Sequence, residues 1–310
     1  MEKWYNFKNS LNVKEYIKFW KNNNFQFFYI NDFPWMKYQN ILQPAILHGP
    51  YEVPGFTNNQ IKKVLKESGC KFIRWNDNFK NEPTEWWWTI CQRPFSIDLL
   101  SHNARNQIKK SLNNCEIKII KPQELIEKGY QCYLSSCRNH KKTSFLNHKD
   151  WGKFINSHIK YNCFDFWGIF IDNKIIGYAK CVKINKLIDI SAIWYDPFYL
   201  KYYPVYALTY SLLEYYLNKE KCYFVSNGMR SIAHDTQMQN FLKTKFHFKK
   251  EYCRLNVVYS PLFHFLIQIA YPFQSIIKFL DKIFSINIFH KIVVILKQEK
   301  IRRSFLNSSK

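Results

Sequence analysis

The amino-acid sequence predicts an α+β fold, in which a mixed, mostly antiparallel sheet is flanked by helices. Three consecutive β-rich runs are separated by the short connections "DNK" and "NK", and they therefore predict an antiparallel meander. An amphipathic segment follows, with Pro204 at its first turn, and leads to a further β-rich run. These elements are expected at residues 163–171, 174–184, 187–195, 204–219 and 222–227. A meander that crosses through a helix to another strand is typical of this class.

The same criteria place the other elements after residue 100. Apolar residues at helical spacing predict helices, and alternating apolar residues predict strands. The first of these helices opens at Asn103, and the last opens at Thr236, whose spacing to Gln239 is that of a capping box. The helices are expected at 103–114, 122–137, 149–161 and 236–246, and the strands at 115–122 and 253–260.

The first hundred residues give a weaker pattern. Strands are expected at 25–30, 70–75 and 85–92, and a helix is expected at 58–68. We therefore predict two packed halves joined near residues 94–102, the first being a degenerate copy of the second. The division is 1–100 for the N-terminal half, 101–260 for the C-terminal half, and 261–310 for a basic, amphipathic helical tail.

The composition limits the class of protein. A chain of 310 residues with 47% apolar residues can bury a sizeable core, and its net charge of +23 favours anionic partners. An AT-rich genome, which enriches Lys on any surface, is the alternative explanation of the charge. The nine cysteines are scattered in apolar runs without a C-x-x-C motif, so we expect reduced core thiols and no metal site. The N-terminus lacks the apolar region of a secretory signal, and we expect a cytoplasmic protein.

The C-terminal segment 261–310 is apolar and basic. It contains eight Lys or Arg against two acidic residues, and its apolar runs are too interrupted for a membrane-spanning helix. One interpretation is an amphipathic element in peripheral contact with an anionic membrane at the inner face. The other is a helical annex packed on the second half.

Several stretches resemble the GNAT acyltransferases. The segment "FIDNKIIGYA" resembles their second hairpin, and "WYDPFYLKYYPVYALTYSLLEYYL" resembles their acyl-donor segment and central helix. A narrower resemblance is to the FemAB-like proteins, which join two GNAT-like halves and include aminoacyl ligases. It rests on "LLSHNARNQIKKSLNN" and "QNFLKTKFHFKKEYCRLNVVY", where His247 replaces the family's Gly and the turn must form without a permissive residue.

The resemblance implies transfer of an acyl or aminoacyl group to an amine or hydroxyl of a cell-envelope or surface-glycan precursor. The donor would be acyl-CoA or aminoacyl-tRNA. Yet the loop "YLKYYPVYA" lacks the glycines with which GNAT enzymes cradle phosphates, which weakens the case for acyl-CoA and leaves tRNA as a partner that suits the charge. A non-catalytic binding protein with a lost donor site is the alternative. A nucleic-acid-binding protein is the third, although no motif for sequence-specific DNA binding is present.

Eight residues are candidates for the site. As catalytic groups we consider the phenol of Tyr206 as a proton donor, Asp189 and Asp196 as bases at the two ends of the stretch "DISAIWYD", and the titratable His234. Tyr206 could equally be a packing residue, Asp196 with Pro197 could merely end the strand, and His234 could fix its loop. The candidates for donor binding are Lys201, Tyr203, Arg230 and Ser231. Asp165, among aromatic residues, would have a raised pKa if it were buried.

Overall fold

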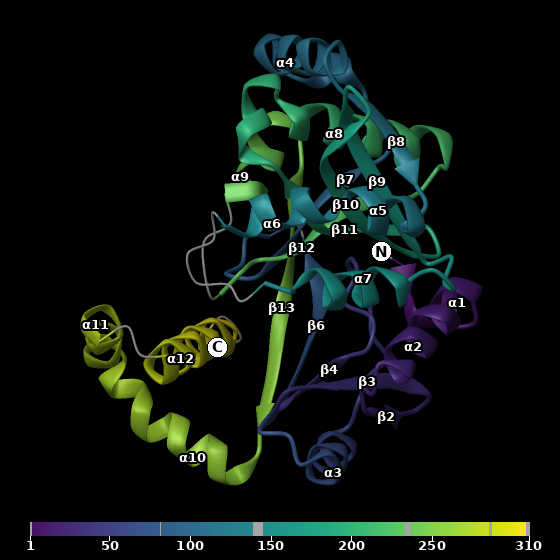
Figure 1. Ribbon diagram of the computed structural model, residues 1–310. Helices are drawn as coiled ribbons and strands as arrows, with labels where there is room; N and C mark the ends of the chain where they lie inside the picture. The colour runs from purple at the N-terminus through teal and green to yellow at the C-terminus, as the bar shows by residue number, and fades with distance from the viewer. Residues whose placement is uncertain (1, 81, 139–144, 233–236, 285–286, 308–310) are drawn as a thin grey trace.

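The chain forms one large mixed sheet covered by helices (Figure 1). A computed structural model describes residues 2–80, 82–138, 145–232, 237–284 and 287–307. Its main sheet has 11 strands in the order β2-β3-β4-β6-β13-β7-β12-β11-β10-β9-β8, and β1 (Glu2–Lys3) pairs with β5 (Tyr51–Glu52) in a separate two-stranded sheet. The predicted fold class, an α+β arrangement with a mostly antiparallel sheet, is confirmed.

The C-terminal part contains the expected meander of β9 (Phe164–Ile171), β10 (Lys174–Ile184) and β11 (Leu187–Tyr195). Asp172 and Asn173 make the first hairpin turn with φ of 48° and 61°, values that Asp and Asn tolerate better than most residues. Helix α8 (Pro204–Leu213) then crosses to β12 (Phe224–Met229), which pairs with β11 in parallel. The predicted late turn also forms at His247 in the left-handed region, with φ of 57°.

The N-terminal part repeats this order. A meander of β2 (Phe27–Ile30), β3 (Phe33–Tyr38) and β4 (Ile41–Pro44) is followed by α3 (Asn58–Ser68) and by β6 (Phe72–Lys80), which pairs with β4 in parallel. The final strand of each part pairs with the other part of the chain. β13 (Lys249–Tyr259) lies between β6 and β7 (Trp87–Gln92), and β7 lies next to β12. One continuous sheet therefore spans both parts, and the division into halves near residues 94–102 stays a prediction.

Two clusters of apolar side chains pack on the sheet. The first includes Trp151 and Tyr178, and the second includes Leu208 and Ile190. The remaining helices and strands are α1 (Trp4–Phe7), α2 (Leu11–Asn22), α4 (His102–Leu112), β8 (Glu116–Ile120), α5 (Pro122–Lys128), α6 (Tyr130–Arg138), α7 (His148–Asn156) and α9 (Gln237–Lys245). A single helix over 122–137 was expected, but the chain forms two, because α5 ends at Gly129. Eight of the nine cysteines are buried and all nine are free.

The C-terminal segment forms an arm of helices beside the lower end of β13 (Figure 1). It consists of α10 (Pro261–Ala270), α11 (Gln274–Phe284) and α12 (Asn287–Asn307). Arg303 connects α12 to the end of α10. Its Nη2 donates to Oε1 of Gln268 at 2.8 Å, and its guanidinium lies 3.8 Å from the ring centre of Tyr271. Across the described ranges, no helix combines the length and the apolar character needed to cross a membrane.

Candidate functional site

Strands β11 and β12 separate part of the way along their length. They pair only from Leu187 to Asp189 on β11, opposite Phe224 to Ser226 on β12, although β11 runs on to Tyr195. Beyond the last pair β12 bends through Gly228, whose φ is 76°. We call this opening, at the carboxyl ends of the two parallel strands, the β11–β12 fork. Such ends are where ligands bind in many sheets with parallel strands.

Side chains replace the missing strand pairing inside the fork. The Asn227 amide donates to the carbonyl of Ile190 at 3.3 Å, across the gap. From α9, the buried amide of Gln239 donates to the carbonyls of Asn227 and Met229 at 3.2 and 3.0 Å. These carbonyls belong to the part of β12 that has left β11, so Gln239 stabilises the separated conformation of the strand.

A chain of buried polar groups ends at the base of the fork. Nδ1 of His48 lies 2.9 Å from Oδ2 of Asp189, and its Nε2 lies 2.6 Å from the hydroxyl of Tyr16. Burial holds the pKa of Tyr16 far above its usual value, so this phenol stays protonated and donates to Nε2. The imidazole then donates from Nδ1 to the carboxylate of Asp189, an assignment that follows from the partners.

Asp189 has one oxygen left for a ligand. Its Oδ1 is buried and has no hydrogen-bond partner within the described part of the chain. Nearby on β10, burial lowers the pKa of Lys180 to about 8, against an opposing effect of the Asp189 charge. The Lys180 amino group lies 5.3 and 5.9 Å from the ring centres of Phe154 and Phe164. A free carboxylate oxygen and an amine with a lowered pKa are groups that can accept a hydrogen bond and exchange a proton with a substrate.

The predicted residue Asp196 has a structural position. Its Oδ1 accepts hydrogen bonds from the Ser135 hydroxyl at 2.7 Å and from the backbone N–H of Phe198 at 3.1 Å. It thereby caps the 3₁₀ turn Pro197–Tyr202. The turn exposes Lys201, whose amino group lies over the rings of Phe198 and Tyr202.

Tyr203 and Tyr206 lie at the amino end of α8. The backbone of Tyr203 is left-handed, with φ of 57°, and its carbonyl accepts from the Ser111 hydroxyl of α4 at 2.8 Å and from the N–H of Tyr206 at 2.9 Å. Tyr206 is buried and makes a perpendicular ring contact with Phe241, and burial raises its pKa. Because Pro204 has no N–H, this helix end offers few donors to a phosphate.

Asp165 is occupied by internal partners. Its carboxylate accepts from the Lys183 amino group at 2.8 Å and from the Tyr216 hydroxyl at 2.7 Å. Tyr216 in turn accepts from the indole N–H of Trp167 at 3.0 Å. This network joins β9 and β10 to the π-helical turn Glu214–Lys219 that follows α8, and it leaves Asp165 without a role at the fork.

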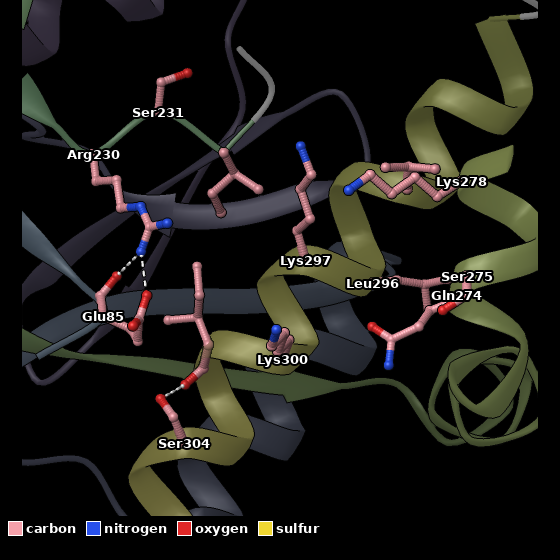
Figure 2. A pocket seen from close by; sticks show the side chains of 13 residues that line it. Glu85, Arg230, Ser231, Gln274, Ser275, Lys278, Leu296, Lys297, Lys300 and Ser304 are labelled. Carbon is pink, nitrogen blue, oxygen red and sulfur yellow. Dashed lines mark hydrogen bonds and ion pairs between the residues drawn. The ribbon is translucent and has the colours of Figure 1, made fainter. Parts of the chain in front are cut away.

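Arg230 and Ser231 lie just beyond β12, in the lining of a pocket of about 640 Å³ (Figure 2). The Arg230 guanidinium bonds to the backbone carbonyl and to Oε2 of Glu85, and it also lies 4.7 Å from the ring centre of Trp87. From the other side, α11 and α12 place three lysines in the lining. The cationic side chains of this pocket, which we call the cationic pocket, are Arg230, Lys278, Lys297 and Lys300.

The predicted His234 lies outside the described residues, as does the Thr236 cap. The structure places Asp189 at the base of the fork, and Arg230 and Ser231 beyond its β12 edge. The other predicted residues lie at or near the amino end of α8: Tyr206, Asp196, Tyr203 and Lys201. Sequence reasoning missed Tyr16, His48 and Lys180. The signal for Lys180 was a charged residue inside an apolar strand; nothing local marked the other two.

Metal coordination has no support from the described side chains. No group of three or more His, Cys, Asp or Glu residues among them is arranged to hold an ion. The acid–base groups at the fork are instead a carboxylate, an imidazole, a phenol and an amine. These groups can donate and accept protons and hydrogen bonds.

Comparison with known proteins assigns the fold. No protein-family model matches the chain, and no curated protein matches it in sequence. The solved structure of FemX is similar with a TM-score of 0.58 at 7% identity, over 83% of this chain and 94% of that one. The C-terminal domain of a protein described as a lysylphosphatidylglycerol synthetase from Agrobacterium fabrum gives 0.55 at 11% identity, over 84% and 90%. The chain has the fold of FemX and of that domain, which is the Fem-type fold that its sequence motifs suggest.

Proposed function

We propose, from this fold, that the protein is a transferase that moves an acyl or aminoacyl group to an amine or hydroxyl. The acceptor would be a cell-envelope or surface-glycan precursor, and the transfer would be direct. The observation that supports the proposal best is the free Oδ1 of Asp189 at the base of the β11–β12 fork, with Lys180 nearby. An unpartnered buried carboxylate oxygen is costly unless a ligand supplies a donor.

In the proposed mechanism the acceptor amine donates an N–H to Oδ1 of Asp189. His48 and Tyr16 hold the other oxygen, so the carboxylate keeps its orientation. Neutral Lys180 takes the proton that the amine loses as its nitrogen bonds to the carbonyl carbon of the donor. The bond from that carbon to the donor oxygen or sulfur then breaks, and the lysine ammonium returns its proton to the leaving group. Proximity and proton transfer supply the rate.

Aminoacyl-tRNA is the donor we favour. The amino end of α8, where a GNAT enzyme would hold the pyrophosphate of CoA, contains Pro204 and is packed against α4 through Ser111 and Tyr203. The net charge of +23 suits a polyanionic donor, and the cationic pocket offers three lysines to a phosphate of donor or acceptor, beside an Arg230 that is paired with Glu85.

The test is donor binding followed by transfer. The thermal midpoint is measured with acetyl-CoA, with charged tRNA and with the same tRNA uncharged. Each measurement is made at two salt concentrations, because binding through phosphate contacts weakens as salt is added. Transfer is then measured as loss of the labelled aminoacyl group to a panel of amines. The expected result is faster loss from charged tRNA when acceptor is present. Binding without any transfer would favour the alternative, a non-catalytic binding protein.

A further inference from the structure

The C-terminal arm exposes a stripe of large apolar side chains. They recur at intervals of one to four residues from α10 to the start of α12, mostly three or four, which is the spacing of one helix face. Each of these side chains is more than half exposed: Leu262, Phe265, Leu266, Ile269, Phe273, Ile276, Phe279, Ile283, Phe284 and Ile288. We call these residues the apolar stripe. Single exposed apolar residues are ordinary, but a continuous series of this length marks an interaction surface.

The stripe is exposed although the arm itself is well packed. On the opposite side of α10, Ile267 is buried, and the Arg303 contacts with Gln268 and Tyr271 fix α10 against α12. In α12, Leu296 and Ile301 are buried as well. In Figure 1 α10 and α11 stand away from the sheet, whereas α12 lies between them and β13 and packs against that strand. The stripe on α10 and α11 is therefore available to a partner outside the chain.

Basic residues flank the stripe. At 3.6 residues per turn, Lys282 lies about 60° around α11 from Phe279, at the edge of the apolar face. Lys278 lies about 100° from Phe279, between the apolar face and the pocket. No carboxylate among the described residues forms an ion pair with either lysine. Lys278 also lines the cationic pocket with Lys297 and Lys300, as Figure 2 shows. An apolar face bordered by lysines complements an anionic lipid surface.

We infer that the arm of α10 and α11 docks this protein on an anionic bilayer. The apolar stripe enters the boundary between headgroups and acyl chains, and Lys278 and Lys282 bind the phosphates of anionic lipids. Since Lys278 belongs to the pocket as well, docking brings the cationic pocket to the lipid surface. A second copy of the chain fits the stripe less well, because the lysines of both copies would add like charges to one interface.

Vesicle flotation of the full chain tests this inference. Wild type is expected to float with vesicles of phosphatidylcholine containing about one third phosphatidylglycerol, and to float weakly with phosphatidylcholine alone. The triple variant Ile276→Ser, Phe279→Ser, Ile283→Ser should lose flotation. The pair Lys278→Gln, Lys282→Gln should weaken binding to anionic vesicles by about fivefold per lysine and leave binding to neutral vesicles unchanged.

Matched variants elsewhere on the surface serve as controls. The triple Leu11→Ser, Leu99→Ser, Phe198→Ser removes equally exposed apolar side chains, and the pair Lys62→Gln, Lys66→Gln removes two exposed lysines from one face of α3. Both should float like wild type. The inference is wrong if the control variants lose flotation as much as the stripe and lysine variants do, or if wild type binds neutral vesicles as well as anionic ones. It is also wrong if the protein is a dimer in solution that the stripe variant converts to a monomer without affecting flotation. Flotation needs no donor, so it can fail or succeed independently of the transferase proposal.

Discussion

Oδ2 of Asp189 lies 2.9 Å from Nδ1 of His48, a residue 141 positions earlier in the chain. This contact joins the loop after β4 to the last residue of β11 that pairs with β12. It orients the carboxylate from one side and leaves Oδ1 free on the other.

Replacing Asp189 with Asn should lower the transfer rate by about a hundredfold, because the acceptor amine loses the carboxylate oxygen that orients it. An Asn side chain can still accept from Nδ1 of His48, so the fold should be kept and the thermal midpoint should fall only slightly. The rate is measured under single turnover with saturating donor. Asp196→Asn is the matched control, because Asp196 caps a turn. If both variants transfer at the wild-type rate, Asp189 has no catalytic role.

The transfer rate should rise with pH through about 8. Burial lowers the pKa of Lys180 to about 8, so raising the pH increases the fraction of neutral amine that can accept a proton. The variant Lys180→Met keeps the length of the side chain but has no proton to exchange. Its residual rate should lose this rise, whereas Lys183→Met, which disrupts the pair with Asp165, should retain it. An unchanged profile in Lys180→Met would assign the rise to another group.

Stability should fall in acid partly because of His158. Burial first, and then the charge of Lys180, lower the pKa of this imidazole to about 3, while the Nδ1 bond to the Phe154 carbonyl at 2.8 Å opposes them. Since the unfolded chain binds the proton near pH 6.5, the free energy of unfolding should decrease as the pH falls from 6.5 towards 3, by at most about 1.4 kcal/mol per pH unit. Urea titrations of wild type and His158→Gln should differ in this range, and parallel curves would contradict the assignment.

The variant Gln239→Leu should destabilise the fold by about 1–3 kcal/mol, because the carbonyls of Asn227 and Met229 lose their donor. We expect the transfer rate to fall even under conditions where the variant is fully folded, since β12 shapes one side of the fork. Denaturant unfolding and transfer rates are measured together. The exposed Gln237 on the same helix supplies the control Gln237→Leu, which should behave like wild type. Equal effects in the two variants would mean that Gln239 acts only through helix propensity.

Local pattern was sufficient for most elements of the C-terminal part. Alternating apolar residues and the Asp-Asn turn determined the meander, and the apolar face opening at Pro204 determined α8. In the N-terminal part β3 and β4 escaped prediction, since each contains a proline, Pro34 and Pro44, and a proline argues against a strand. Helix α2 also escaped, although Val13, Tyr16 and Phe19 lie on its buried face.

The sequence by itself determined the fold class, the order of the second meander and the candidacy of Asp189, because these depend on residues close together in the chain. Only the tertiary structure decided which polar groups meet. Tyr16 and His48 reach Asp189 from distant segments, and burial among aromatic rings, which no local pattern reveals, sets the pKa of Lys180. The insertion of β13 between β6 and β7 was likewise decided by long-range pairing, whose register depends on the whole sheet.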